Sequence, residues 1–182
     1  MVFLFFVFNC STSYTQSLVK DFDFAFGATG ADYNVDFIRC SQGGYAVLAA
    51  STSDSSSIKS EHNRDSIGYS FDYWLIRFDD NGHKLWDRTY GGTASDVPSS
   101  LVEAPNGDFI LGGTSASNIG FEKSEAPRGG NDFWILRVDS LGNVLWDKTI
   151  GGDDIDNIGG ITQTVDGNYV VGAYSLSGIS GN

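Results

Sequence analysis

Short apolar and aromatic runs alternate with turn-forming residues along the chain, a pattern that predicts short β-strands joined by hairpins. Residues 72–79 form an apolar run rich in β-forming residues, and Asp80-Asn81-Gly82 follows as a turn signal because Asn and Gly tolerate positive φ. Further strands are expected over about 84–90, 97–104 and 108–115. No window has a sustained apolar period of 3.6 residues, so helix is not expected to be a major component.

The same pattern returns 60 residues later. Asp72-Tyr73-Trp74 recurs as Asp132-Phe133-Trp134, and Leu85-Trp86-Asp87 recurs as Leu145-Trp146-Asp147. An earlier copy of the repeat is offset by 64 residues, and in it Phe22-Asp23 aligns with Trp86-Asp87. A fixed period of this length indicates a stack of supersecondary units, none of which buries its apolar face alone.

The repeat divides the chain into a leader and a repeat region. Residues 1–15 are interpreted as a secretory signal: a short apolar run precedes small polar residues, with cleavage expected near Thr15. No basic segment comes before the run, so the signal is expected to be clipped at its start or Met1 to be an internal start. Residues 16–182 are the repeat region, with units over about 18–71, 72–131 and 132–182. The first unit lacks a recognisable counterpart of the 72–79 strand, and the last stops before its linker, so a truncated, self-associating fragment is expected.

Composition narrows the classes of partner. The formal net charge is −12, which disfavours nucleic acid and anionic membrane surfaces because both require clustered Lys and Arg. No segment is long enough to be a predicted membrane span. With the leader removed, Cys40 is the only thiol, so no intrachain disulfide is expected and stability must come from packing.

The repeat motif resembles a group of secreted repeat proteins of Bacteroidota-type bacteria. Their units read roughly D-Y-W-hydrophobic-K-L-D-x-x-G-x-x-x-W-x-K-x-x-G-G followed by D-G-G-Y-hydrophobic-x-G, carried here by residues 72–92 with 106–113 and by 132–152 with 166–173. The resemblance implies an all-β fold, a β-propeller fragment with four-stranded antiparallel blades, of which about two and two-thirds are present. It also implies export, in many such proteins by the type IX secretion system.

Tryptophan spacing favours the same architecture. Asp79-x-x-Gly82-x-x-x-Trp86 recurs around Trp146 and is similar to the tryptophan-docking hairpin of quinoprotein propellers and, more loosely, to the Asp-box of sialidase-like propellers. Such tryptophans are able to form a sugar-stacking platform. Their fixed place in every repeat favours instead a role in the blade core, which is predicted for all four: Trp74, Trp86, Trp134 and Trp146.

Recurring carboxylates are the first candidates for chemistry. The glycine-containing turn in each unit is followed by an aspartate: Asp32, Asp96 and Asp156. These residues are candidate metal ligands or acids. The favoured interpretation is that they accept hydrogen bonds from turn N–H groups. Asp153 and Asp154 join Asp156 as weak calcium candidates because hard cations select oxygen ligands. The equivalent stretch 93–96 has one carboxylate, so neither a metal nor a cofactor is predicted.

The linkers before each Asp-aromatic-Trp motif supply the candidate ligand-binding residues, on the ground that loops on a rigid scaffold often carry function. These residues are Lys59, Glu61 and Arg64 in one linker and Lys123, Glu125 and Arg128 in the next. The alternative is that each Glu pairs with the Lys or Arg of its own linker. Such pairs are expected to be solvated and weak.

Catalysis has little support in the sequence. No G-x-S-x-G, H-E-x-x-H, P-loop or C-x-x-C motif is present, and Arg77 and Arg137 are related by the repeat, which favours a structural role for both. We therefore predict a non-catalytic scaffold or binding module, secreted or on the bacterial outer cell surface, whose partners are a glycan or protein and the remaining blades of a longer chain. The alternative is part of a glycan-active, sialidase-like hydrolase with catalytic residues in blades outside this chain.

Overall fold

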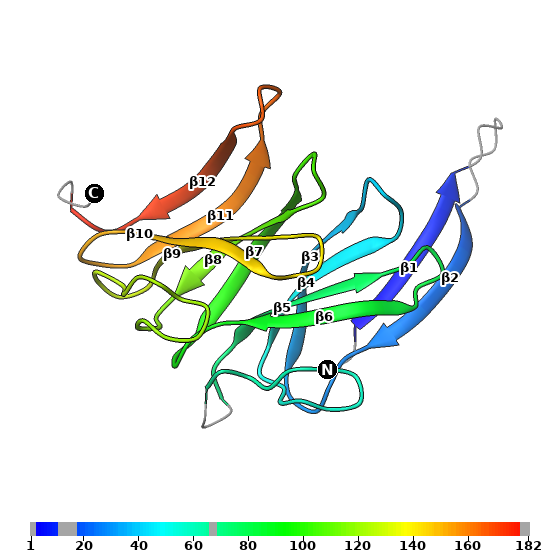
Figure 1. Cartoon of the computed structure of the whole chain (residues 1–182), viewed down its shortest axis with the longest axis horizontal. Helices are drawn as coiled ribbons and strands as arrows, with labels where there is room; N and C mark the ends of the chain where they lie inside the picture. The colour runs from blue at the N-terminus through cyan, green and yellow to red at the C-terminus, as the bar shows by residue number, and fades with distance from the viewer. Residues whose placement is uncertain (1–2, 11–17, 66–68, 179–182) are drawn as a thin grey trace.

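The structure is a computed structural model that describes residues 3–10, 18–65 and 69–178, with side chains described from Phe26 onward. Every regular element in these residues is a β-strand, which confirms the all-β prediction (Figure 1). The strands are β1 (Phe3–Cys10), β2 (Leu18–Phe26), β3 (Asp32–Arg39), β4 (Tyr45–Ser51), β5 (Asp72–Phe78), β6 (Lys84–Tyr90), β7 (Asp96–Glu103), β8 (Phe109–Ser115), β9 (Asp132–Val138), β10 (Val144–Ile150), β11 (Asp156–Gln163) and β12 (Tyr169–Ser175).

The strands pair antiparallel with their neighbours in the chain. Two four-stranded sheets, β3-β4-β5-β6 and β7-β8-β9-β10, lie between the two-stranded sheets β1-β2 and β11-β12. Figure 1 shows the four sheets arranged side by side in sequence order. The four-stranded antiparallel sheets expected from the repeat are therefore present.

The boundaries of the sheets do not coincide with the boundaries of the sequence repeats. β6 and β7 were expected in one sheet, since both lie in the unit 72–131, but they belong to different sheets. That expectation is wrong because the linker before β5 folds back and places Asp72 opposite Ser51 of β4. The Asn63 side-chain amide donates to the carbonyls of Ser51 and Ser70, both at 3.0 Å, and so ties the two ends of the linker together.

β1 fills the position for which no counterpart of β5 was recognised. Phe26 is the equivalent of Tyr90 at the 64-residue offset. Phe3 pairs with Phe26 in the same way as Tyr73 pairs with Tyr90. The backbone thus gives residues 3–10 the place of a β5-like strand, which corrects the expectation that this strand is missing. The expected cleavage near Thr15 lies outside the described residues.

The core lies between the sheets. Tyr73 of one four-stranded sheet packs on Trp134 of the next with ring centroids 5.0 Å apart, and its hydroxyl donates to the Trp134 carbonyl at 3.2 Å. On the other side of the first sheet, Phe26 stacks on Trp74 with ring centroids 5.2 Å apart. The first strands of successive sheets are in contact: β7 contacts both β3 and β11. Burial of these aromatic faces holds neighbouring sheets together.

Candidate functional site

The linker lysines lie inside the protein rather than on a rim. Lys59 is 0% exposed and Lys123 is 2% exposed. Lys59 Nζ donates to the Glu61 carbonyl at 2.7 Å, and Lys123 Nζ donates to Thr149 Oγ1 at 2.5 Å. Burial lowers the pKa of Lys59 to about 8, although the charge of Asp72 opposes this shift. The expectation of solvated lysines is wrong because each ammonium group has a hydrogen-bond partner inside the protein, and buried carboxylates such as Asp72 lie near Lys59.

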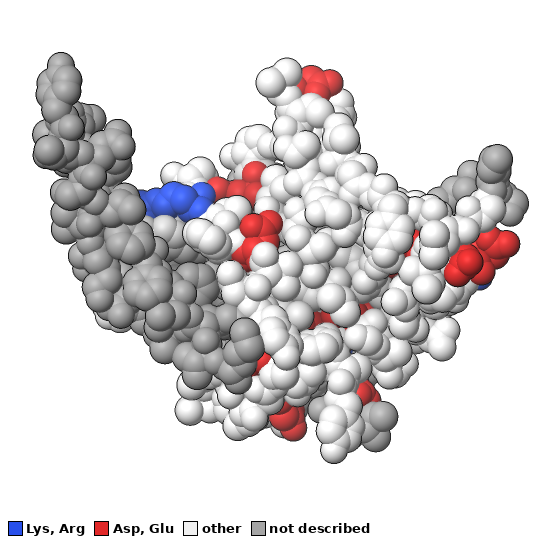
Figure 2. Space-filling view, turned by 180° about the vertical axis from the view of Figure 1, so that it is seen from behind, with Lys and Arg blue, Asp and Glu red and all other residues white. Residues whose placement is uncertain are grey.

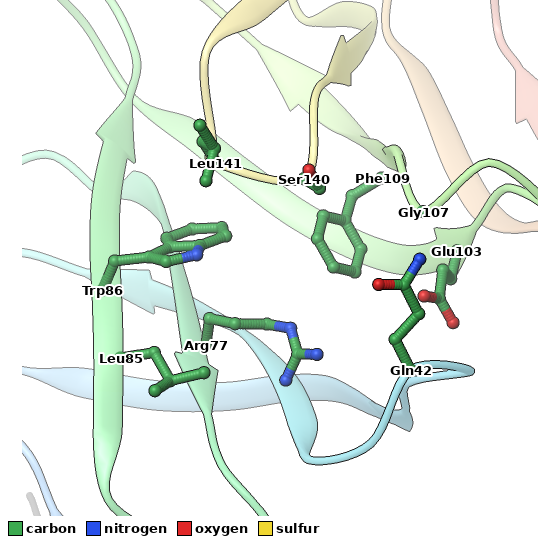
Figure 3. Close-up of a pocket in the computed structure, with 9 residues that line it drawn as sticks. All are labelled: Gln42, Arg77, Leu85, Trp86, Glu103, Gly107, Phe109, Ser140 and Leu141. Atoms are coloured by element: carbon green, nitrogen blue, oxygen red, sulfur yellow. The ribbon is translucent and has the colours of Figure 1, made fainter.

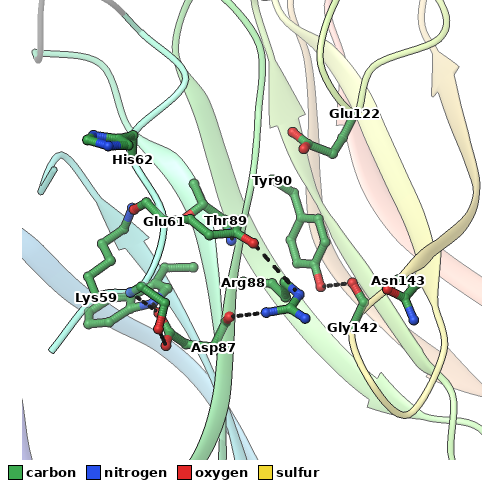
Figure 4. A network of polar contacts seen from close by, with 12 residues as sticks. Lys59, Glu61, His62, Asp87, Arg88, Thr89, Tyr90, Glu122, Gly142 and Asn143 are labelled. Carbon is green, nitrogen blue, oxygen red and sulfur yellow. Dashed lines mark hydrogen bonds and ion pairs between the residues drawn. The ribbon is translucent and has the colours of Figure 1, made fainter. Parts of the chain in front are cut away.

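Glu61 and Arg64 of the first linker are bonded internally, and Figure 4 shows Glu61 beside Arg88 of β6. The predicted ion pair between Glu61 and Arg64 is confirmed, with 3.0 Å between Oε2 and Nη2. Glu61 also accepts the backbone N–H of Thr89 at 2.9 Å. Arg64 Nη2 reaches Glu122 of the following linker at 2.8 Å. Arg64 thereby joins two successive linkers instead of facing a ligand.

The second linker uses different partners. Glu125 pairs with Lys148 of β10 at 2.7 Å, in place of the expected partners Lys123 or Arg128, and accepts the Thr149 N–H at 3.0 Å. Arg128 Nη1 donates to the Gly151 carbonyl at 3.3 Å. Each linker is thus docked onto the outer hairpin of its own sheet, and its charges vary between repeats.

The recurring aspartates bind turn N–H groups, which confirms the structural interpretation. Each accepts a bond of 2.7 Å from the backbone N–H four residues earlier: Asp32 from Ala28, Asp96 from Gly92 and Asp156 from Gly152. Serine hydroxyls donate further bonds to these carboxylates, as Ser117 does to Asp96 Oδ2 at 2.8 Å. These carboxylates fix the connection between consecutive sheets.

The calcium candidates do not converge. Asp153 accepts the N–H of Gly178 at 3.1 Å and Asp154 accepts that of Ile155 at 2.8 Å, while Asp156 is bonded within its turn. Within residues 3–10, 18–65 and 69–178, no group of three or more His, Cys, Asp or Glu side chains is arranged to hold a metal ion. Nor do these residues contain a helix long and apolar enough to cross a membrane.

Two of the four tryptophans are core residues, as predicted. Trp74 and Trp134 are fully buried. Their indole N–H groups donate to Asp87 at 2.9 Å and Asp147 at 3.0 Å. The same carboxylates accept backbone N–H groups of the linkers, so each aspartate joins a core ring to a linker.

The remaining two tryptophans are less buried. Trp146 is 41% exposed, so the prediction of a core position is wrong for it: the next sheet, β11-β12, has two strands in the described residues, and its β11 packs on β7, β8 and β9. Trp86 is partly buried, with its ring tilted edge-on to Phe109 at a centroid distance of 6.3 Å. Trp86 also lines a pocket between the two four-stranded sheets.

This pocket has a volume of about 300 Å³ and lies where the turns of the two four-stranded sheets meet (Figure 3). Its apolar walls are Leu85 and Trp86 of β6, Phe109 of β8 and Leu141 of the β9-β10 turn. Hairpins from both sheets therefore contribute, and neither sheet forms the pocket alone.

Polar side chains line the rest of the pocket. Arg77 is held by three carbonyls, among them Gly43 at 2.7 Å, which supports its predicted structural role. Arg137, its equivalent, pairs with Asp108 at 2.8 Å. Glu103 accepts both the backbone N–H and the hydroxyl of Ser41, at 2.7 and 3.0 Å. These bonds hold Arg77 and Glu103 in place in the pocket lining.

Sequence reasoning missed this pocket because two of its polar residues, Gln42 and Glu103, do not recur. Gln42 is replaced by Asn106 in the next unit, and Glu103 is replaced by Gln163. A search for residues shared by all repeats selects the scaffold instead. The signal that could have identified the pocket is a polar residue that differs between units at a turn that is otherwise constant.

Comparison with known proteins assigns no relative to the chain: no protein-family model matches it, and no curated protein matches it. The resemblance to secreted repeat proteins therefore stays a prediction.

The distribution of charge on the surface agrees with the negative net charge of the sequence. Figure 2 shows acidic side chains scattered over one face of the molecule with few basic ones among them.

Proposed function

We propose that this chain is a non-catalytic binding module of a β-propeller repeat protein, with an extracellular glycan or protein as its ligand. The propeller arrangement is supported by antiparallel four-stranded sheets in sequence order, packed face to face with their first strands in contact. Fold alone does not define function, so the proposal depends on how the polar residues are used.

The observation that carries the proposal is a difference between residues that recur in each unit and residues that do not. Recurring residues outside the pocket form internal bonds: Lys59 and Lys123 donate within the protein, and Asp87 accepts from Trp74 and Ser60. The non-recurring side chains Gln42 and Glu103 line an open pocket at the sheet junction. A constant scaffold that carries a variable pocket is typical of a binding module.

The location outside the cell, secreted or on the outer surface, is part of the proposal and rests on the apolar residues 2–8. In the structure, residues 3–10 pair with β2. Sequencing the amino terminus of the mature protein purified from its natural host decides the matter. A terminus near residue 16 supports export, whereas a terminus at Met1 identifies β1 as a permanent strand and contradicts the proposed location.

Binding and turnover are separated by testing the intact protein on glycans and proteins in parallel. We expect saturable binding to an immobilised glycan or extracellular protein, and no product release from a panel of chromogenic glycosides, sialosides included. Hydrolysis that disappears in Glu103→Gln would contradict the non-catalytic proposal and favour the hydrolase alternative. Failure to bind both ligand classes while the protein stays folded would also contradict it.

A further inference from the structure

We propose that the Trp86 pocket is a binding site for a neutral glycan, with the indole as stacking platform and Gln42 as the principal hydroxyl-binding group. The inference rests on the proposed function and names the ligand class and residues of one site. It depends on four features: an available indole, converging polar groups, a balanced charge and a small volume.

Trp86 is available to a ligand in a way that the core tryptophans are not. The indole N–H groups of Trp74 and Trp134 are bonded to aspartates inside the protein. The Trp86 N–H has no hydrogen-bond partner in the described part of the chain, and its ring is only partly buried. An indole of this kind offers an apolar face for sugar C–H groups and a donor for a hydroxyl.

Polar groups from two sheets converge opposite the indole. A Cβ added to Gly107 would lie 3.6 Å from Gln42 Nε2 and 3.9 Å from Ser140 Cβ, so these two side chains approach each other over this glycine. Gly107 has φ of 85°, a conformation that favours glycine and keeps the space open. Gln42 has no hydrogen-bond partner among the described residues, so its amide is free to donate to and accept from ligand hydroxyls.

The charge of the pocket favours a neutral ligand. Arg77 is the cation that lines it, and its guanidinium donates to three carbonyls, including those of Tyr45 at 3.2 Å and Phe78 at 2.6 Å. Glu103 places a carboxylate in the same lining. The surrounding protein carries a net charge of −12. Carboxylated or sulfated sugars would therefore enter a negative potential without an uncommitted cation to receive them.

The pocket is small for a protein ligand. A volume of about 300 Å³ lies at the lower end of the range for small-molecule sites. It suits a terminal sugar or a disaccharide, with apolar contact to Trp86, Phe109 and Leu141. A folded protein partner would instead require a large and flatter surface.

The test begins with an array of neutral and acidic oligosaccharides, followed by calorimetric titration of the intact protein with the strongest neutral hit. Gln42→Ala is the primary variant because its side chain makes no internal hydrogen bond, and Trp86→Phe removes the indole N–H while keeping an aromatic ring. Tyr69→Ala is the control, an 87%-exposed aromatic residue that does not line the pocket. Circular dichroism and thermal melting show that each variant is folded.

We expect Gln42→Ala to weaken binding about tenfold and Trp86→Phe to weaken it severalfold, with Tyr69→Ala unchanged. Ligand should also change tryptophan fluorescence, and this change should shrink in Trp86→Phe. Glycan binding that both pocket variants retain would overturn the site while leaving the proposed function intact. Binding confined to acidic glycans, or binding to a protein alone, would overturn the ligand class assigned here.

Discussion

β8 and β12 occupy the same place in successive repeats, yet their surroundings differ. All seven residues of β8 are buried, whereas β12 is exposed along almost its whole length. β8 is paired on both edges, by β7 and β9, and β12 pairs with β11 alone among the described strands. Their sequences, FILGGTS and YVVGAYS, are similarly apolar.

The difference teaches that burial in this molecule is a property of the neighbouring sheets rather than of a strand's own sequence. A repeat that matches another residue for residue still contributes little stability if its partner strand and facing sheet are missing. Its apolar side chains and unpaired backbone groups then favour association with other chains. The predictions below compare buried positions with exposed ones.

The largest effect is expected from a charge placed at the centre of each strand. Leu111→Lys puts an unpaired ammonium in a fully buried site and should prevent folding. Val171→Lys, at a site that is 36% exposed, should leave the fold intact and reduce self-association of the parent protein. Circular dichroism and light scattering test both outcomes. A folded Leu111→Lys protein would contradict the assignment of β8 to the core.

Tryptophan truncation should separate the same two environments by stability. Trp134→Ala removes a fully buried ring and is expected to cost about 3–5 kcal/mol of unfolding free energy. Trp146→Ala removes a ring that is already 41% exposed and should cost less than about half as much. Urea unfolding measures both. Equal losses would show that Trp146 is covered by another surface in solution.

The buried end of β5 should make stability depend on pH. Burial raises the pKa of Asp72 to about 8 from 3.8, the Arg64 N–H opposes this, and the charge of Asp96 adds to it. The folded state therefore binds more protons than the unfolded state between about pH 4 and 8, and the stability from this group is lost as pH rises through that window.

The amide side chain introduced by Asp72→Asn cannot ionise, so the unfolding free energy of this variant should depend less on pH. Between pH 5 and 7.5 the parent should lose up to ~1.4 kcal/mol per pH unit from this group. The matched control is Asp54→Asn, an exposed carboxylate whose pKa is lowered by bonds to Ser55 and His62. Unfolding free energies measured across the window test the assignment. A slope that Asp72→Asn leaves unchanged would place the responsible group elsewhere.

The smallest effect concerns arginines in contrasting surroundings. Arg64 bonds Glu61, Glu122 and the Thr89 carbonyl in a largely buried network, so Arg64→Ala should cost about 1–3 kcal/mol. Arg39 pairs with Asp80 at an exposed site, and Arg39→Ala should cost less than about 1 kcal/mol. Thermal unfolding under the same buffer conditions compares them. A cost below that of Arg39→Ala would show that Arg64 does not connect the linkers in solution.

The strands and hairpin turns were predictable because their signals are local. Each Asn-Gly or Asp-Gly turn requires positive φ at its glycine, which the structure shows at Gly82 and Gly167. The pairing of β4 with β5 was not predictable, since it depends on how a long linker folds. The linker does so through Asn63, a residue with no distinctive sequence context.

The candidate site was less predictable than the fold. Lys59 has the sequence context of an exposed lysine, and only the three-dimensional cover over its stem shows that it is buried. The pocket joins Gln42 and Trp86, which are far apart in sequence and come from different hairpins. Recurrence identified Trp86, but as a scaffold residue, while Gln42 and Glu103 in the same pocket vary between units.

The offset between repeat and sheet bears on how such a chain can lengthen. Each four-stranded sheet combines one hairpin from each of two successive repeats. If unequal recombination inserts one repeat length, the two kinds of hairpin therefore still alternate along the chain, wherever the crossover occurs. The new sheet is completed by hairpins that were already compatible with both neighbours. Gene duplication in this architecture therefore requires no privileged boundary, and new pockets can arise at each added junction through drift at the turn residues alone.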